Sequence, residues 1–351
     1  MSLYTLVPSK DKFAYDAAVK PRVDVGYFLG KNLNAYPIVY PMFSPAPENS
    51  ALDTDQALLD YLLTILRKQR IAFLPGDAVL FQLPSYSFNY RLEEVFASYL
   101  DSIGCYSLGL IHDVEYLRGF AAEPDGDLKL MNAMDGVILH SEAMGTKLEE
   151  LGLKVPWVTR GPWDYHISED TQNRRKITAD APLVYSGNLS EGKSKFLKEF
   201  THKIDILGGM DPWVTNVVST NPKVTFKGTE TPDYLPTTLS EAGYQVGLLY
   251  DGNFSNFDSG YTSYLTYNWS HKVSAYLSAG LYVYAPSWSN AGKYLLDKGA
   301  GNVFNKLEDT AFTKEPGVNF AVKTLQSKIK RGYFITEAVQ NLEEEISFNG
   351  K

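Results

Sequence analysis

The sequence has little cysteine, little surplus positive charge and no long apolar run, and each shortage excludes a class of protein. Its one cysteine, Cys105, cannot form an internal disulfide and is expected to be a small buried residue of a strand. The formal net charge of −8 argues against a nucleic-acid binder, because a phosphate backbone demands a basic surface. No apolar run approaches the roughly 20 residues that a membrane helix needs. Residues 1–13 also lack the pattern of a signal peptide, so we expect a cytoplasmic protein.

Metal-ligand spacings and the common catalytic motifs are absent as well. His140, His166 and His202 stand alone, without a second ligand at the spacing that a metal site needs. No HExxH or GxSxG sequence occurs, no GxGxxG follows an expected strand, and there is no P-loop. We therefore expect no metal site.

What the chain does have is the length and composition of a globular protein with two domains. At 351 residues it is too long for one ordinary core. Hydrophobic residues make up 44% and charged residues 21%, a balance that is typical of folded chains. The 24 tyrosines suit a surface that binds sugars or another subunit, because tyrosine combines a ring with a hydroxyl group.

Short apolar strands alternate with amphipathic helices in both halves of the chain. In the first half we expect strands at 3–7, 36–42, 78–83, 106–112, 136–140 and 155–159, with helices at 51–67, 89–103 and 142–151. The second half has expected strands at 183–186, 204–207, 224–226, 246–250 and 281–285, with helices at 193–200, 232–239, 271–279, 291–296 and a pair after 311. The alternation predicts an α/β fold with two doubly wound, Rossmann-like domains, 1–160 and 182–331, joined by the polar linker 161–181 and facing one interdomain cleft.

One segment, 264–286, carries the clearest local signals. A helix is expected after Asn268 or Ser270, either of which can cap it, and Gly280 stands where a left-handed residue would end it. Polar side chains crowd the helix start, and a helix N-terminus attracts phosphate through its free N–H groups. His271 and Lys272 would add charge there, which points to the diphosphate of a nucleotide sugar. The alternative is that Lys272 is a solvated first-turn lysine.

Two further sites lie at expected strand ends. Gly187 and Asn188 follow a strand, where backbone amides could approach a ligand, and Lys193 opens the next helix; the alternative is a plain turn. His112 and Asp113 follow another strand and form a candidate acid/base pair. The alternative there is a capping aspartate beside a histidine bonded in the core.

Several of these motifs resemble those of one enzyme family. They are GDAVLFQLPSYS at 76–87, LIHDVEYL at 110–117, HSEAMGTKLEELGL at 140–153, GPWD at 161–164, GN at 187–188, YNWSHKVSAYLSAG at 267–280 and RGYFITEAV at 331–339. With them the chain resembles bacterial glycosyltransferases of the two-domain GT-B fold. It is most similar to the accessory glucosyltransferases that extend the glycans of serine-rich adhesins and to the related β-1,6-galactofuranosyltransferases.

The resemblance implies a UDP-sugar bound by the second domain. Lys272 would neutralise the diphosphate, and Phe226 or Lys227 would contact the uracil. The other residues implied in donor binding are Gly187, Asn188, Lys193, Tyr267, Asn268, Ser270 and His271. GT-B enzymes stabilise the leaving phosphate with a helix dipole and basic side chains, so we expect neither a metal nor a cofactor.

The resemblance also implies the reaction: transfer of a hexose, of the glucose or galactofuranose class, from a UDP-sugar to a hydroxyl group of a glycan or glycoprotein. Asp113 or His112 is the candidate base. The alternative is a non-catalytic GT-B subunit that docks or chaperones a partner glycosyltransferase, and such a subunit would lose the basic residues at 271–272. A two-lobed periplasmic-type binding protein is disfavoured because no signal peptide is recognisable. Association of identical chains is left open.

The resemblance further implies that a final helix, 332–348, crosses back onto the first domain. An apolar stripe supports this, because it must be buried somewhere. Its members are Tyr333, Phe334, Ala338, Val339 and Leu342. The alternative is a helix that packs only on the second domain.

Overall fold

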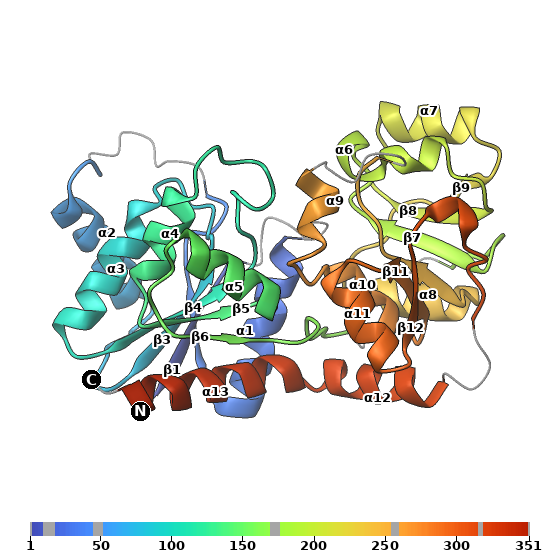
Figure 1. Ribbon diagram of the computed structural model, residues 1–351. Coiled ribbons are helices and arrows are strands. Elements are labelled where there is room, and N and C mark those ends of the chain that lie inside the picture. Colours follow the sequence, from blue (N-terminus) through green and yellow to red (C-terminus); the bar gives the residue numbers. More distant parts are fainter. Residues whose placement is uncertain are drawn as a thin grey trace.

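The chain forms two α/β units, each built on a parallel sheet (Figure 1). The computed structural model describes residues 2–9, 18–44, 52–168, 176–253, 260–314 and 319–349. Within these residues each sheet has six strands, and all neighbouring strands pair in parallel. This confirms the doubly wound architecture that the alternation of strands and helices predicts.

The first sheet has the strand order β2-β1-β3-β4-β5-β6. Its strands are β1 (Leu3–Val7), β2 (Tyr36–Val39), β3 (Ala78–Leu83), β4 (Tyr106–Ile111), β5 (Gly136–Leu139) and β6 (Trp157–Thr159). The helices of this unit are α1 (Val19–Leu33), α2 (Asp55–Lys68), α3 (Arg91–Ser102), α4 (Asp125–Asn132) and α5 (Glu142–Leu151). Pro21 lies in the first turn of α1, where its missing N–H costs no helical hydrogen bond.

The second sheet has the strand order β12-β11-β10-β7-β8-β9. Its strands are β7 (Leu183–Gly187), β8 (Ile204–Gly208), β9 (Val224–Phe226), β10 (Val246–Leu248), β11 (Tyr282–Pro286) and β12 (Gly301–Phe304). Its helices are α6 (Glu191–Ser194), α7 (Pro212–Thr220), α8 (Leu235–Ala242), α9 (Gly260–Tyr264), α10 (His271–Ser278), α11 (Asn290–Asp297) and α12 (Asn319–Lys330). The last helix, α13 (Tyr333–Asn349), runs beneath the first sheet in Figure 1.

Five of the described elements were not predicted from the sequence pattern: α1, α4, α7, α9 and β12. α7 begins with a recognisable signal, since Asp211 Oδ1 accepts a hydrogen bond from the Val214 N–H at 2.9 Å and Pro212 opens the helix. Its valines and threonines, however, favour strands when judged by propensity alone. The helix predicted for 193–200 is shorter and tighter, because α6 ends at Ser194 and a 3₁₀ turn covers Lys195–Lys198.

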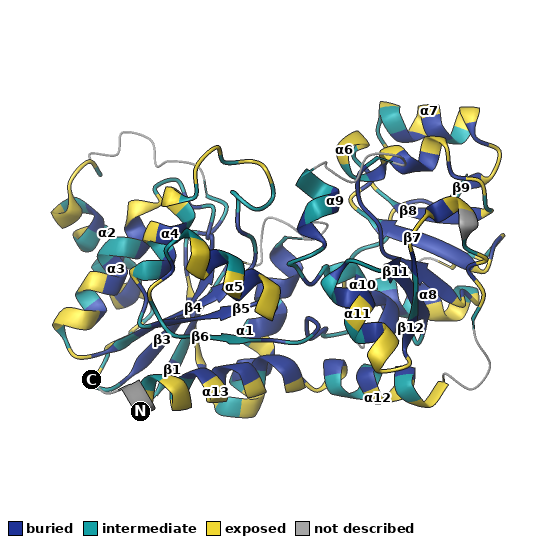
Figure 2. Cartoon of the chain, in the orientation of Figure 1, coloured by how far each residue is buried: buried dark blue, intermediate teal, exposed yellow. Residues whose placement is uncertain are grey.

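The strands of both sheets form the buried centre of each unit (Figure 2). One hydrophobic cluster fills the second unit and continues through Trp163 and Tyr165 to the α1 side of the first sheet. A separate cluster covers the other side of the first sheet and includes Tyr264 of α9. The polar segment that was predicted as a linker therefore contributes two buried aromatic side chains to a core that spans both units.

The final helix is held on the first unit by both packing and hydrogen bonds. Among the residues described, α13 contacts α1, β5 and β6. Both oxygens of the Asp164 carboxylate accept hydrogen bonds from the start of α13: Oδ1 from the Phe334 N–H at 3.2 Å, and Oδ2 from the Ile335 N–H at 2.6 Å. A Cβ built on Gly332 would lie 2.5 Å from Cγ of Phe28, so only glycine permits this approach to α1.

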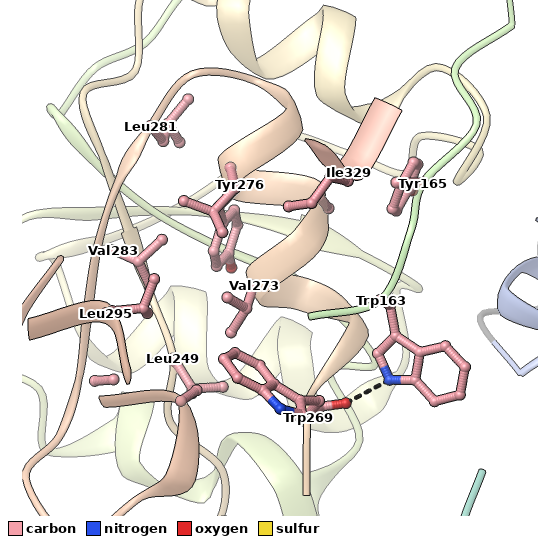
Figure 3. Close-up of a cluster of buried hydrophobic side chains, with 14 of the residues drawn as sticks. Trp163, Tyr165, Leu249, Trp269, Val273, Tyr276, Leu281, Val283, Leu295 and Ile329 are labelled. Atoms are coloured by element: carbon pink, nitrogen blue, oxygen red, sulfur yellow. Dashed lines mark hydrogen bonds between the residues drawn. The ribbon is translucent and has the colours of Figure 1, made fainter. Parts of the chain in front are cut away.

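The segment 264–286 folds as a loop, a helix, a glycine stop and a buried strand. Trp269, Val273 and Tyr276 face the core of the second unit, as Figure 3 shows. Gly280 has φ +80°, which confirms the predicted left-handed end of the helix. The predicted side-chain cap is wrong: Ser270 is the N-cap residue, but its hydroxyl makes no capping hydrogen bond.

Candidate functional site

A cavity of about 860 Å³ lies between the carboxyl ends of the two sheets. This is where a ligand binds in open parallel sheets. Among the residues that line the cavity are nine that the sequence selected: His112, Asp113, Gly187, Asn188, Lys193, Asn268, Ser270, His271 and Lys272. The fold therefore brings together, from three segments of the chain (112–113, 187–193 and 268–272), most of the residues proposed for the donor and for proton transfer.

Three of the selected residues do not line the cavity. Lys227 Nζ lies 2.7 Å from Asp180 Oδ2 and 3.8 Å from Asp205 Oδ2, so this lysine serves an ion-pair network on the second sheet. Phe226 packs against the core of the second unit. Tyr267 packs against the first unit, and its carbonyl accepts a hydrogen bond from Ser141 Oγ at 2.7 Å.

Lys272 is held in a buried polar network. Its Nζ lies 2.5 Å from Asp251 Oδ1 and 2.8 Å from the Tyr185 hydroxyl, and it sits 4.0 Å from the centroid of the Tyr185 ring. Burial lowers the pKa of Lys272 to about 8, although Asp251 opposes the shift. The alternative of a solvated lysine is therefore wrong.

Beside Lys272 the cavity is lined by the backbone of two glycines, Gly187 and Gly208. Gly187 ends β7 with φ +117°, and a Cβ placed on it would lie 3.4 Å from Lys272 Cε. A Cβ on Gly208, at the end of β8, would fall 2.1 Å from the Gly187 carbonyl oxygen. Glycine is thus required at both strand ends. Asn188 also shapes the turn, since its side-chain oxygen accepts a hydrogen bond from the Ser190 N–H at 2.8 Å.

The loop that leads into α10 is hydrogen-bonded to His140 of the first unit and to Trp163. His140 Nδ1 accepts a hydrogen bond from the Trp269 N–H at 2.9 Å, and the Trp163 indole N–H donates to the Trp269 carbonyl at 2.6 Å (Figure 3). His140 Nε2 lies 2.8 Å from the carbonyl oxygen of Ile111, and burial lowers the pKa of this histidine to about 3. His140 is therefore a neutral side chain that positions the start of α10, a role that its isolation in the sequence did not reveal.

The His112 side chain is held by a hydrogen bond and by a ring contact. Its Nε2 lies 2.8 Å from Gln82 Oε1, and its ring stacks on Trp163 with centroids 4.6 Å apart. The Gln82 amide nitrogen donates to two backbone carbonyls, so its oxygen faces His112, and Nε2 of His112 carries the proton. Burial lowers the pKa of His112 well below its usual value, and the nearby arginines Arg22 and Arg160 add to the shift.

Asp113 keeps 29% of its side-chain surface exposed and lines the cavity. Burial raises the pKa of Asp113, while Arg118, with Nη1 3.3 Å from Asp113 Oδ2, opposes the shift. Arg118 also binds Glu115 at 2.8 Å and the hydroxyl of Tyr86 at 3.1 Å. These contacts hold the carboxylate in place beside the cavity.

The sequence missed Arg118, Asp251 and Arg22, all of which line the cavity. Arg118 follows the selected pair by five positions, and Asp251 directly follows an expected strand, so strand-end position could have identified both. Arg22 could not be found this way, because it lies inside α1 and reaches the Pro84 carbonyl at 2.8 Å through the fold.

No group of three or more histidine, cysteine, aspartate or glutamate side chains among the described residues is placed to hold a metal ion. None of their helices combines the length and apolarity required to cross a membrane.

The chain is similar to known glycosyltransferases in sequence. Residues 10–162 match the N-terminal domain, and residues 183–342 the C-terminal domain, of the glucosyltransferase 3-like family. Beta-1,6-galactofuranosyltransferase WbbI of Escherichia coli (strain K12) is 24% identical over 252 residues, which cover 68% of this chain and 71% of the relative. Glucosyltransferase 3 of Streptococcus gordonii is 25% identical over 263 residues, which cover 73% of each chain.

Solved structures show the same fold at low sequence identity. Sucrose-phosphate synthase from Thermosynechococcus elongatus superimposes with a TM-score of 0.55 and 11% identity, covering 99% of this chain and 97% of that one. The O-GlcNAc transferase of Thermobaculum terrenum gives a TM-score of 0.54 at 12% identity, covering 98% of this chain and 68% of that one. The fold is therefore GT-B, as expected. With two facing sheets, the cavity between them and family matches over both units, the chain belongs to the glucosyltransferase 3-like family.

Proposed function

We propose that the chain transfers a hexose, of the glucose or galactofuranose class, from a UDP-sugar to a hydroxyl group of a glycan or glycoprotein. The observation that carries the proposal is the meeting of two kinds of group in one cavity. Lys272, Lys193 and the bare Gly187 backbone lie on the second unit, and Asp113 lies opposite on the first. The activities named for the two relatives support the choice of sugar.

The second unit would hold the donor diphosphate. The N–H groups at the start of α10 and the ammonium groups of Lys272 and Lys193 provide positive charge where the leaving UDP gains negative charge. Lys193 lines the cavity, with its Nζ 5.4 Å from the centroid of the Tyr261 ring, so its charge can reach a ligand there. Lys272 would exchange part of its contact with Asp251 for a phosphate oxygen.

Asp113 is the better of the two candidate bases. A general base works best when its pKa lies near the working pH. Burial raises the pKa of Asp113 toward that range, whereas the pKa of His112 is shifted away from it. Asp113 would accept the proton of the acceptor hydroxyl as the sugar is transferred, and His112 would support the site through its contact with Trp163.

A panel of UDP-sugars tests the proposal directly. We expect one UDP-hexose to release UDP in the presence of a saccharide acceptor, with a new glycosidic product detected by mass spectrometry. Absence of both UDP release and UDP binding across the panel would contradict the proposal. A subunit that only docks a partner transferase is less favoured, because it would have no need to keep Lys193 and Lys272 at the cavity.

We also expect the reaction to need no divalent cation. Two lysines and a helix start can carry the charge of the leaving diphosphate. Activity measured with and without excess EDTA should therefore be equal. Loss of activity in EDTA that manganese restores would contradict this expectation.

A further inference from the structure

We infer that Phe120 and Tyr261 form a stacking platform for a second sugar ring of the acceptor, next to the sugar that receives the hexose. The inference rests on the proposed function and extends it to an acceptor that is at least a disaccharide. The two rings come from different units, Phe120 from the loop after β4 and Tyr261 from α9.

The rings meet at the edge of the cavity. Their centroids are 5.4 Å apart and their planes are 80° apart, and Tyr261 is one of the residues that line the cavity. Phe120 is 54% exposed and belongs to neither hydrophobic cluster, so its position is not explained by core packing. A partly exposed aromatic ring beside a polar cavity suits the C–H groups of a sugar ring.

The backbone brings the two rings together. A Cβ on Gly260 would fall 2.2 Å from the carbonyl oxygen of Arg118, and a Cβ on Gly119 would lie 3.6 Å from Gly260 Cα. Gly119 also has φ +77°, a conformation that side-chain-bearing residues rarely adopt. Both glycines therefore allow the loop of the first unit to touch α9, which extends toward that unit in Figure 1.

The platform is also placed correctly relative to the reacting groups. The guanidinium of Arg118 lies 4.7 Å from the centroid of Phe120, and the same side chain contacts Asp113. Lys193 Nζ lies 5.4 Å from the centroid of Tyr261. Phe120 thus lies one side chain away from Asp113, the proposed base, and Tyr261 lies beside Lys193, which is proposed to bind the donor diphosphate, so a sugar on the two rings would be next to the reacting groups.

The test compares Phe120→Ala with Phe320→Ala. Phe320 is 83% exposed on α12 and does not line the cavity, so it controls for the loss of an exposed phenyl ring. The acceptor probes are p-nitrophenyl glycosides of glucose, galactose and N-acetylglucosamine, each as the monosaccharide and as a disaccharide. We expect Phe120→Ala to raise KM about tenfold or more for the disaccharide, because burial of a phenyl ring is worth at least that factor.

Three other measurements separate stacking from a purely structural role. In Phe120→Ala, we expect unchanged affinity for UDP, unchanged release of UDP in the absence of acceptor, and a smaller effect on the monosaccharide glycosides. Phe120→Trp should restore the KM for the disaccharide, since it returns a ring. Saturation-transfer NMR with UDP present should show contact to the second sugar in the wild type and in Phe320→Ala, but not in Phe120→Ala.

Several results would overturn the inference. An unchanged KM for the disaccharide in Phe120→Ala would do so. Equal weakening of UDP binding and acceptor binding would also do so, because it would mean that the ring pair only stabilises the contact between the two units. A wild type that shows no contact with any disaccharide probe would also overturn it. Failure of the proposed function looks different, because UDP would then neither bind nor be released in any variant.

Discussion

At the scale of single residues, the network around Lys272 controls how the proposed donor site would bind UDP. The ammonium group of Lys272 is not free in solvent, because it forms an ion pair with Asp251 and a hydrogen bond with the Tyr185 hydroxyl. This arrangement fixes its position before a ligand arrives, so little side-chain freedom remains to be lost on binding. It also makes the charge of Lys272 sensitive to its carboxylate neighbour.

Replacing Lys272 by alanine should weaken UDP binding by about 1.5–3 kcal/mol, because a charge-assisted contact to phosphate is lost. Isothermal titration calorimetry measures the change, with Lys323→Ala on the outer face of α12 as the control. Part of the loss would come from the Asp251 carboxylate left facing phosphate. The double variant Lys272→Ala, Asp251→Asn should therefore bind UDP more tightly than Lys272→Ala alone. Unchanged affinity in Lys272→Ala would contradict the donor assignment.

The affinity for UDP should also depend on pH through Lys272. The protonated ammonium binds phosphate, so affinity should fall as pH rises through the pKa of about 8. In Asp251→Asn the carboxylate that raises this pKa is gone, and the fall should begin at lower pH. Calorimetric titrations across the neutral to alkaline range measure both curves. Coincident curves for the two proteins would mean that Asp251 does not control the charge of Lys272.

At the scale of elements, the end of α10 matters because this helix carries Lys272 into the cavity and continues directly into β11. Gly280 permits the reversal between them with φ +80°. A Cβ there would lie 3.6 Å from Gln326 Nε2, which is ordinary contact. Space is therefore not limiting, and the conformation alone requires glycine.

Gly280→Ala should lower the stability of the protein by about 1–2 kcal/mol, the cost of a left-handed residue with a side chain. Gly126→Ala is a matched control, because Gly126 lies within α4 with nothing within 4 Å of its added Cβ. That change should leave stability unchanged or raise it slightly, since alanine favours helices. Thermal unfolding midpoints compare the two. Equal midpoints would show that the turn after α10 adapts without strain.

At the scale of the whole molecule, α13 joins the end of the chain to the first unit. Its buried residues Ile335, Val339 and Leu342 belong to the cluster that continues into the second unit. Leu342 Cδ1 lies 2.9 Å from where a Cβ on Gly136 would be, and Gly136 begins β5. The helix thus covers the sheet whose strand ends form one wall of the cavity.

Removal of the residues after Gly332 should loosen the first unit as well as the second. Hydrogen exchange should show lost protection in β3 (Ala78–Leu83), β5 or their neighbours, because the face that α13 covers would meet water. Leu342→Ala is a milder version, with an expected cost of about 2–5 kcal/mol from the cavity it leaves. Loosening confined to the second unit would show that α13 is not needed by the first.

The sequence by itself determined what depends on neighbours in the chain. The alternation of strands and helices, the glycine that ends α10, and the strand-end positions of Gly187 and Asp113 are readable because period, capping and turn chemistry act over a few residues. The sequence did not predict the short helix α9 or the valine-containing helix α7, because tertiary packing overrides their weak local preferences.

Only the tertiary structure decided which side chains meet. Lys272 pairs with Asp251, His140 holds the backbone of Trp269, and Phe120 touches Tyr261. The same packing took Lys227 away from the cavity and into an ion-pair network. These contacts join residues that are distant in sequence, and they follow from the way the two sheets, α9 and α13 pack together. No local pattern contains that information, since burial and charge at each position depend on the partner that the fold supplies.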